Sequence, residues 1–331
     1  MNNHRGSYTG SANIRLNLYN VQVDETTIPI TLTYNSSGVK VNQEASWIGL
    51  GWDLTIGGSI TESVFGSHFD ENEYDRRNEP IFDFEGQGVA GTYGSYQTEV
   101  PFTHCGYNGP DGEEVNIFSY QVLGYSGKFY WDALTQDFKS FGEKKEDVFI
   151  TGQRERVPYG NWASFTLRPG NGMTFTFERD VSILDIADGW GPGFGYPSGQ
   201  FHLTRIELAN GKQITFDYVG PFLVKKSVFR NSISGNTTDT HTVNFIGYTD
   251  TYTTQLSKIT TPYETIHFQL APRLDMAHED DSGISGLNRL HQISILENLS
   301  GNLVKSFVFN TGYFTDELIL DRLKLNARLK L

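Results

Sequence analysis

The sequence predicts an all-β protein, predominantly antiparallel, in which successive hairpins form one curled sheet or a large β-sandwich with long loops. Aromatic residues make up 14% of the 331 residues and charged residues only 20%, a composition typical of strands and unlike that of disordered chains or coiled coils. Many segments alternate apolar and polar residues with a period of two, and turns containing Gly and Asn separate them. A chain of this length can bury a large core.

The chain begins with a polar segment, residues 1–12, whose Gly and Ser content predicts a flexible tail ahead of a single elongated β-domain over 13–331. The domain starts with an alternating strand at residues 14–18. The next strand, 28–34, alternates in the same way. Pro29 has no N–H to donate to a ladder, so this strand is expected at a sheet edge or to start at the proline.

The stretch that follows, residues 35–58, carries the most specific pattern of the chain. A turn at Asn35–Gly38 leads into a short strand over 39–41, because Asn and Gly tolerate positive φ. Two indoles then flank Gly49-Leu-Gly51, and glycines at this spacing let large rings pack over bare backbone or permit a bulge. The residues that define this structural signature are Tyr34, Gly38, Trp47, Gly49, Gly51 and Trp52.

Hairpins are expected along the rest of the chain. The clearest is 203–218, where the Asn210-Gly211 turn separates two alternating runs. Residues 124–127 are expected to turn the chain in an earlier hairpin. Alternation over 322–331 favours a final strand, which either closes the domain as an edge strand or continues into further chain. A helix over 315–321 could precede this strand. The other hairpins and short strands are expected at 116–131, 138–150, 165–178, 255–270 and 290–310.

Two stretches, 67–115 and 180–200, interrupt the regular pattern and are expected to be long insertion loops, which often carry function. Both contain aromatic side chains that could stack on a sugar ring or contact a protein, or else pack back onto the sheet. The residues proposed for ligand contact in the second loop are Trp190, Phe194 and Tyr196.

Candidates for catalysis and metal binding are few. Cys105 follows His104, but neighbours along a strand point to opposite sides, so this thiol is interpreted as an incidental loop residue. Zinc-type histidine spacing, a nucleophile elbow and a dinucleotide-binding glycine motif are all absent from the sequence. Calcium has some support from the acidic segments Asp70–Asp75 and Asp275–Asp281, although solvated acidic loops are the simpler interpretation. No catalytic, cofactor-binding or metal-binding residue is therefore predicted.

The charge distribution excludes further classes of partner. The net charge of −13, with no cluster of Lys or Arg, argues against binding to nucleic acid or an anionic membrane surface. No run approaches the roughly 18 apolar residues of a membrane span, so no membrane insertion is expected. A single cysteine excludes an internal disulfide framework.

The order of these segments resembles a known family. The block IPITLTYNSSGVKVNQEASWIGLGWDLTIGGSIT resembles the N-terminal region of the large bacterial YD-repeat (Rhs-type) proteins, and is similar, more distantly, to the start of the B component of insecticidal toxin complexes. The Tyr-Asp-x-x-Gly-Arg-Leu repeat that names the family is absent, so the chain would correspond to the region before the repeats. The resemblance continues, in order, through residues 111–131, 201–218, 254–270 and 290–314.

The resemblance implies a structural role. In that family the strands spiral into a hollow shell around a C-terminal, often toxin-like, segment, and self-cleavage belongs to a C-terminal core region that this chain does not contain. We therefore expect a non-catalytic wall segment of a longer bacterial chain, secreted or in the cell envelope, with a signal peptide outside this sequence. Its main partner would be the remainder of its own chain. The alternative is a secreted or cell-surface module that binds a glycan or protein through its loop aromatics, and an enzyme is the third interpretation.

Overall fold

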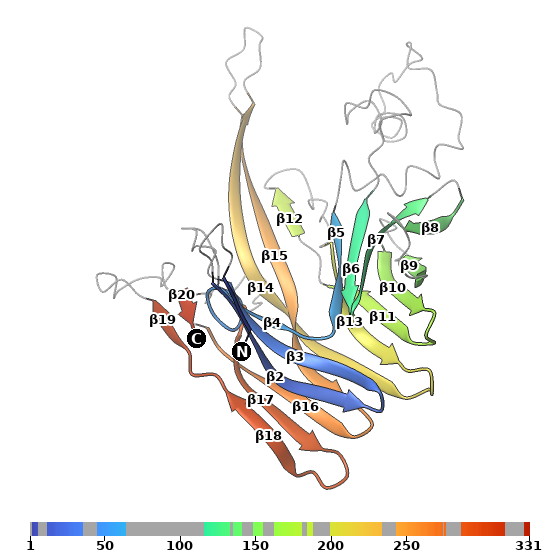
Figure 1. Ribbon diagram of the computed structural model, residues 1–331. Helices are drawn as coiled ribbons and strands as arrows, with labels where there is room; N and C mark the ends of the chain where they lie inside the picture. Colours follow the sequence, from blue (N-terminus) through green and yellow to red (C-terminus); the bar gives the residue numbers. More distant parts are fainter. Residues whose placement is uncertain are drawn as a thin grey trace.

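In the part of the chain that the computed structural model describes, the fold consists of three antiparallel sheets with 14, four and two strands (Figure 1). Every strand pair in the described part of the chain is antiparallel, and no helix occurs there, so the predicted fold class is confirmed. The residues that the structure describes are 2–5, 12–35, 45–63, 116–132, 135–140, 148–154, 162–180, 184–187, 199–233, 243–273, 275, 286–314 and 328–331.

A sheet of 14 strands forms the body of the molecule. Its longest strands, β14 (Gln213–Ile233) and β15 (Val243–Thr260), pair with each other and project beyond the neighbouring strands (Figure 1). The main path runs in the order β18 (Leu303–Val308), β17 (Arg289–Glu297), β16 (Glu264–Ala271), β15, β14, β13 (Gln200–Glu207), β5 (Gly58–Ser63), β6 (Ile117–Val122), β7 (Tyr125–Asp132) and β8 (Asp137–Ser140).

Strand β13 is the branch point of this sheet. One of its edges pairs with β11 (Thr174–Arg179) from Phe201 to Glu207. Its other edge is divided, because Gln200–His202 pair with β5 whereas Arg205–Glu207 pair with β14. Three arms of sheet therefore diverge from one strand: β5 to β8, β14 to β18, and β11 with β10 (Trp162–Pro169) and β9 (Val148–Arg154).

Aromatic rings fill the space between the first arm and the β9–β11 arm. Phe165 of β10 lies at the centre, with its ring centroid 4.9 Å from that of Phe118 and 4.7 Å from that of Phe201. Phe129 stacks on Phe118 at 5.1 Å. All four side chains have no exposed surface, so the phenylalanine-rich composition supplies the core that holds these two arms together.

A second sheet covers the remaining arm. It consists of β1 (Asn2–Arg5), β2 (Ala12–Val23), β3 (Thr26–Asn35) and β4 (Trp52–Thr55), in that order, and it lies over β16 and β17 (Figure 1). The alternation seen in the sequence sets its buried face, because Ile28, Ile30 and Leu32 join the same core as Ile266 and Ile293. Polar contacts fix the position of this sheet, since the Tyr19 hydroxyl of β2 donates to Glu264 of β16 at 2.5 Å.

The outer end of this second sheet is tied to two hairpin turns of the large sheet. Asp24, in the β2–β3 turn, accepts hydrogen bonds from Lys212 at 2.8 Å, Asn210 at 2.7 Å and Tyr263 at 2.6 Å. These donors, Lys212 first, lower the pKa of Asp24 to about 2. Turns separated by more than 180 residues in the chain are thereby held together.

The predicted hairpins agree with the observed pairs. The clearest one pairs Ile206 with Ile214 across the Asn210-Gly211 turn, where Gly211 has a φ of 81°. The pairs β10–β11, β15–β16 and β17–β18 correspond to the hairpins expected at 165–178, 255–270 and 290–310. Pro29 lies inside β3, but β4 pairs only with residues from Thr31 to Tyr34, so β3 is locally an edge at the proline.

Three details differ from the expectations. The turn expected at 124–127 is formed by Leu123 and Gly124, both with positive φ, because Val122 pairs directly with Tyr125. Strand β1 lies within the expected tail, since main-chain pairing with β2 needs no apolar side chains. Strand β12 (Leu184–Ala187) lies within the expected second loop and pairs with the extended part of β15.

Several predicted elements lie outside the described residues. They are the strand at 39–41, the whole loop at 67–115, most of the loop at 180–200, and the helix considered at 315–321. The last residues of the sequence are described, and there β20 (Arg328–Lys330) pairs with β19 (Gly312–Phe314). Leu329 is buried and Lys330 exposed, as the alternation predicts, whereas Leu331 is exposed.

Replacing Phe165 by alanine should lower the free energy of unfolding by about 3–5 kcal/mol, because the ring is fully buried among other aromatics and leaves a cavity. Urea unfolding followed by near-UV circular dichroism measures this change. The control is Leu299→Ala at a side chain that is 96% exposed, which should change the value by less than about 0.5 kcal/mol. Equal effects of the two substitutions would contradict the central position of Phe165.

Candidate functional site

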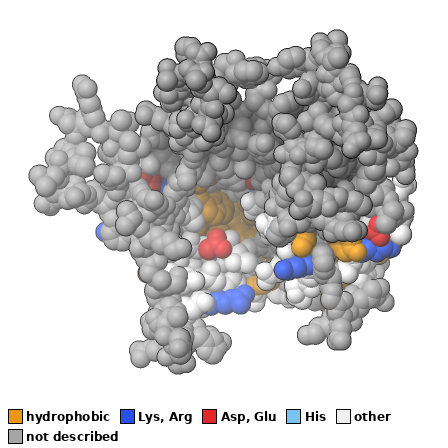
Figure 2. Space-filling view, turned by 90° about the horizontal axis from the view of Figure 1, so that it is seen from above, with side chains coloured by type: hydrophobic (Ala, Val, Ile, Leu, Met, Phe, Trp, Pro, Cys, Tyr) orange, Lys and Arg blue, Asp and Glu red, His pale blue; other side chains and the backbone are white. Residues whose placement is uncertain are grey.

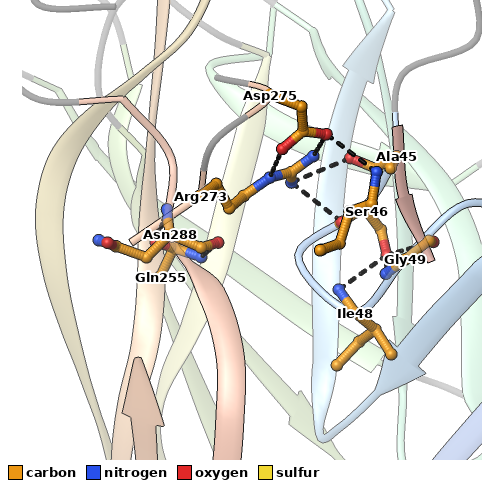
Figure 3. Close-up of polar contacts among 9 residues, drawn as sticks. Ala45, Ser46, Ile48, Gly49, Gln255, Arg273, Asp275 and Asn288 are labelled. Atoms are coloured by element: carbon orange, nitrogen blue, oxygen red, sulfur yellow. Dashed lines mark hydrogen bonds and ion pairs between the residues drawn. The ribbon is translucent and has the colours of Figure 1, made fainter. Parts of the chain in front are cut away.

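The signature block, residues 45–57, forms a turn between β3 and β4 and then leads into β5. Ser46 organises the turn, because its hydroxyl accepts hydrogen bonds from the main-chain N–H groups of Ile48 at 3.1 Å and Gly49 at 3.4 Å (Figure 3). The same hydroxyl donates to the carbonyl oxygen of Trp52 at 2.6 Å. One small side chain therefore satisfies three main-chain groups that no sheet ladder reaches.

The two glycines of the block allow close approach of other parts of the chain. Gly49 has a φ of 148°, and a Cβ there would lie 2.8 Å from the main-chain nitrogen of Leu331. Gly51 has a φ of 77°, and a Cβ there would lie 2.8 Å from the ring of Tyr34. The Tyr34 ring in turn packs on Trp52 with a centroid distance of 4.9 Å. Only glycine satisfies both the conformation and the space at these positions.

A buried ion pair anchors the block to distant segments. The Nη1 atom of Arg273 donates to the carbonyl oxygens of Ala45 at 3.1 Å and Ser46 at 3.0 Å (Figure 3). Its Nε and Nη2 atoms donate to the two carboxylate oxygens of Asp275 at 3.0 and 2.9 Å. The side chains are 0% and 2% exposed. This bidentate geometry compensates the cost of burying both charges.

The same region holds the end of the chain. Asp275 Oδ2 accepts a hydrogen bond from the main-chain nitrogen of Leu329 at 3.0 Å. The Leu329 carbonyl oxygen accepts one from Leu50 at 2.8 Å. The carbonyl oxygen of Trp47 accepts a hydrogen bond from the N–H of Leu290 at 2.8 Å. The signature block is therefore a junction that joins the second sheet to β17 and β20.

A cleft of about 590 Å³ lies beside this junction, in the fork of the large sheet. Its walls come from β5, β13, β14 and β15 on one side and from the polar face of β3 and β4 on the other. Trp47 of the signature block also lines it. Seen from above, the molecule has a hollow with hydrophobic side chains at its bottom and charged side chains nearby (Figure 2).

One side of the cleft carries a histidine held by a buried aspartate. Asp180 is 4% exposed, and one of its oxygens lies 2.9 Å from Nε2 of His202. Thr253 and Thr254 donate their hydroxyls to the same carboxylate at 2.6 and 2.9 Å. His202 also stacks on the ring of Tyr218, with centroids 4.8 Å apart. Burial, followed by the charge of Asp180, raises the pKa of Tyr218, so its hydroxyl stays protonated.

A third polar group is buried at the end of β5. Glu62 is 3% exposed at its side chain and lies 3.8 Å from the Arg179 guanidinium. Asn116 donates to its Oε1 at 3.2 Å, whereas Oε2 has no hydrogen-bond partner among the residues that the structure describes. Burial raises the pKa of Glu62 more than Arg179 and Asn116 lower it.

The structure places only some of the residues singled out in the sequence. Asp275, which belonged to an acidic segment considered for calcium, instead pairs with Arg273, so both of its oxygens are used inside the protein. In the described ranges, no group of three or more His, Cys, Asp and Glu side chains could hold a metal ion. The residues that lie outside those ranges are Gly38, Asp70–Asp75, His104, Cys105, Trp190, Phe194, Tyr196 and 276–281.

Three side chains central to these sites were not identified from the sequence: Arg273, Asp180 and His202. Each is a single polar residue near apolar neighbours, a pattern shared by many exposed strand residues. The only local feature of the sequence that could have indicated one of these contacts is the Arg-Leu-Asp spacing at 273–275. The described residues also contain no helix long and apolar enough to cross a membrane.

Comparison with known proteins gives structural matches only. No protein-family model and no curated protein sequence matches the chain. The chain is similar to TcdB2-TccC3, with a TM-score of 0.43 and 12% identity over 92% of this chain and 15% of that one. It is similar to the Tc holotoxin pore of Photorhabdus luminescens, with a TM-score of 0.39 and 13% identity over 92% of this chain and 14% of that one.

The chain is also similar to a smaller solved domain over almost the whole length of that domain. The N-terminal domain of the effector protein SpvB from Salmonella typhimurium strain LT2 has a TM-score of 0.42 and 12% identity, over 96% of this chain and 97% of that domain. The chain thus spans about 15% of the toxin-complex chains. At these identities the likeness concerns the path of the chain alone.

Breaking the buried ion pair should destabilise the junction strongly. Arg273→Met leaves the Asp275 carboxylate buried without its partner and should lower the free energy of unfolding by about 3–5 kcal/mol. The double variant Arg273→Met/Asp275→Leu should lose less than the sum of the single changes. The matched control is Lys139→Met, whose ion pair with Asp137 is exposed and should contribute less than about 1 kcal/mol. Additive effects in urea unfolding would refute the coupling.

The buried carboxyl of Glu62 should make stability depend on pH. Because its pKa is raised in the folded state, its contribution is present below the unfolded pKa and is lost as the pH rises through the folded value. The stability of Glu62→Gln relative to wild type should therefore improve as the pH rises above about 4.5. Melting temperatures across the pH range measure this trend, with Glu178→Gln at an exposed position as control. A difference independent of pH would disprove the raised pKa.

Proposed function

We propose that this protein is a non-catalytic structural element, a segment of the curved β-wall of a larger bacterial protein that encloses or delivers a C-terminal, toxin-like segment. The observation that carries the proposal is the two long arms of laterally paired strands, β14 to β18 and β5 to β8, that extend from β13. Such a sheet gains its stability from neighbouring strands and can be continued by further strands. The family resemblance of the signature block supports the same role.

The outer edge of the sheet supports this role. Strand β18 pairs with β17 on one side, and no described strand pairs with its other side. Leu303, Val304 and Val308 of this strand are 58%, 56% and 56% exposed. Soluble proteins usually protect such edges with charges, and here Lys305 is the single charge of the strand. An apolar edge of this kind suits pairing with another strand of a larger wall.

The chemistry of the described residues supports a structural element rather than an enzyme. The buried charges described above are paired within the protein, and the signature block is occupied by contacts with other segments. The loop aromatics on which the alternative of a surface binding module depends lie outside the described residues. The wall segment is therefore proposed on the strand arms and the outer edge of the described sheet.

The size and location of the native polypeptide test this proposal. An antibody raised against this chain is used to probe fractionated source cells. A band far above 37.2 kDa in the secreted or envelope fraction is expected for a wall segment of a large exported protein. A band near that mass in the cytosol would refute it, and pre-immune serum provides the control.

A further inference from the structure

The cleft in the fork of the sheet is lined by both apolar and polar side chains, unlike the apolar core. Its volume of about 590 Å³ falls in the range of small-molecule sites. Leu54, Leu123 and Leu256 contribute apolar surface, and Trp47 contributes an indole. Polar side chains are arranged around these groups on strands, which hold them more rigidly than loops would. A pocket with an apolar floor and a few placed polar groups has the general form of a ligand site.

His202 supplies the most defined polar group of the cleft. Nε2 of His202 faces the Asp180 carboxylate, so Nδ1 is the ring nitrogen left for a ligand. This nitrogen accepts a hydrogen bond when the ring is neutral and donates one when the ring is protonated. Within the described ranges, no residue hydrogen-bonds to this Nδ1 atom. Thr253 and Thr254 fix the carboxylate, and Tyr218 fixes the plane of the ring by stacking. His202 therefore offers one oriented ring nitrogen to a ligand hydroxyl, which can both donate and accept.

Two glutamines add amide groups to the same cleft. Gln121 of β6 and Gln200 of β13 both line it with exposed side chains. Each side-chain amide can donate two hydrogen bonds and accept two. Gln121 and Gln200 lie on opposite sides of β5, as register partners of Ser59 and Thr61. They can therefore reach different hydroxyls of one ligand without first breaking contacts that stabilise the fold.

The charged groups of the cleft compensate each other. Arg15 of β2 and Asp53 of β4 both line it, and both are register partners of Thr33, one on each side of β3. They therefore lie on the same face of the second sheet with one strand between them. One positive and one negative group leave the cleft without a net charge for an ionic ligand, which disfavours phosphates and acidic sugars.

We propose that this cleft binds a neutral saccharide. A sugar ring presents vicinal hydroxyls that both donate and accept, matching the imidazole and the two amides, and an apolar face of C–H groups that suits an indole such as Trp47 and the leucine floor. This site is distinct from the loop aromatics considered in the sequence, and it is separate from the wall role proposed above.

The test is a glycan array followed by titration calorimetry of the full chain with neutral disaccharides, using lactose, maltose and N,N′-diacetylchitobiose. At least one neutral saccharide should bind saturably. Gln121→Ala and Gln200→Ala should each weaken binding by about three- to tenfold, the loss of one or two hydrogen bonds. The matched control is Gln269→Ala, an exposed glutamine on β16 outside the cleft, which should leave binding unchanged.

Folding is checked separately, because His202 also contacts the buried Asp180. Melting temperatures of the two cleft glutamine variants should equal that of wild type, since these side chains are exposed. His202→Gln serves as a further variant and should abolish the saturable binding. The absence of binding to every neutral saccharide, binding of acidic glycans or peptides only, or equal weakening by Gln269→Ala would each overturn the proposal.

Discussion

The hydrogen-bonding capacity of β13 is the constraint on which the rest of the structure depends. Each edge of a strand can pair with one neighbour at a time, and here one edge is shared between β5 and β14. The two neighbours must diverge where the pairing changes, and the resulting arms enclose the core on one side and open a cleft on the other. Gly57 lies at this divergence with a φ of 67°, and a Cβ there would meet the Leu203 side chain at 2.9 Å.

The fork leaves one arm of the large sheet with an apolar face, and the second sheet covers that face. An arm of antiparallel strands with one apolar face needs a cover, and β2 and β3 provide it with their alternating residues. The connection from this cover back to the large sheet runs through the buried turn of the signature block. Buried carbonyl groups outside a ladder need donors, and the Arg273 guanidinium supplies them while Asp275 neutralises its charge.

The proposed wall role and the proposed ligand cleft are compatible with the same architecture. The wall role depends on main-chain edges, above all that of β18, and the binding role depends on side chains that face the fork. The cleft groups are positioned by strands whose register is set by the buried core, so their geometry does not rely on long loops. A site of this kind would remain intact whether or not further strands extend the sheet.

The fold class and most hairpins could be predicted from the sequence, because these features depend on local patterns. The Asn210-Gly211 turn is the clearest case, since a turn with positive φ and two alternating runs specify one hairpin. The branching of β13 and the contact of Arg273 with Ala45, 228 residues away, depend on how the strands come together in space. A lone Arg, Asp or His in a strand looks the same in sequence whether it faces water or a buried partner. The physical reason is that burial and pairing of such groups depend on residues brought together only by the fold.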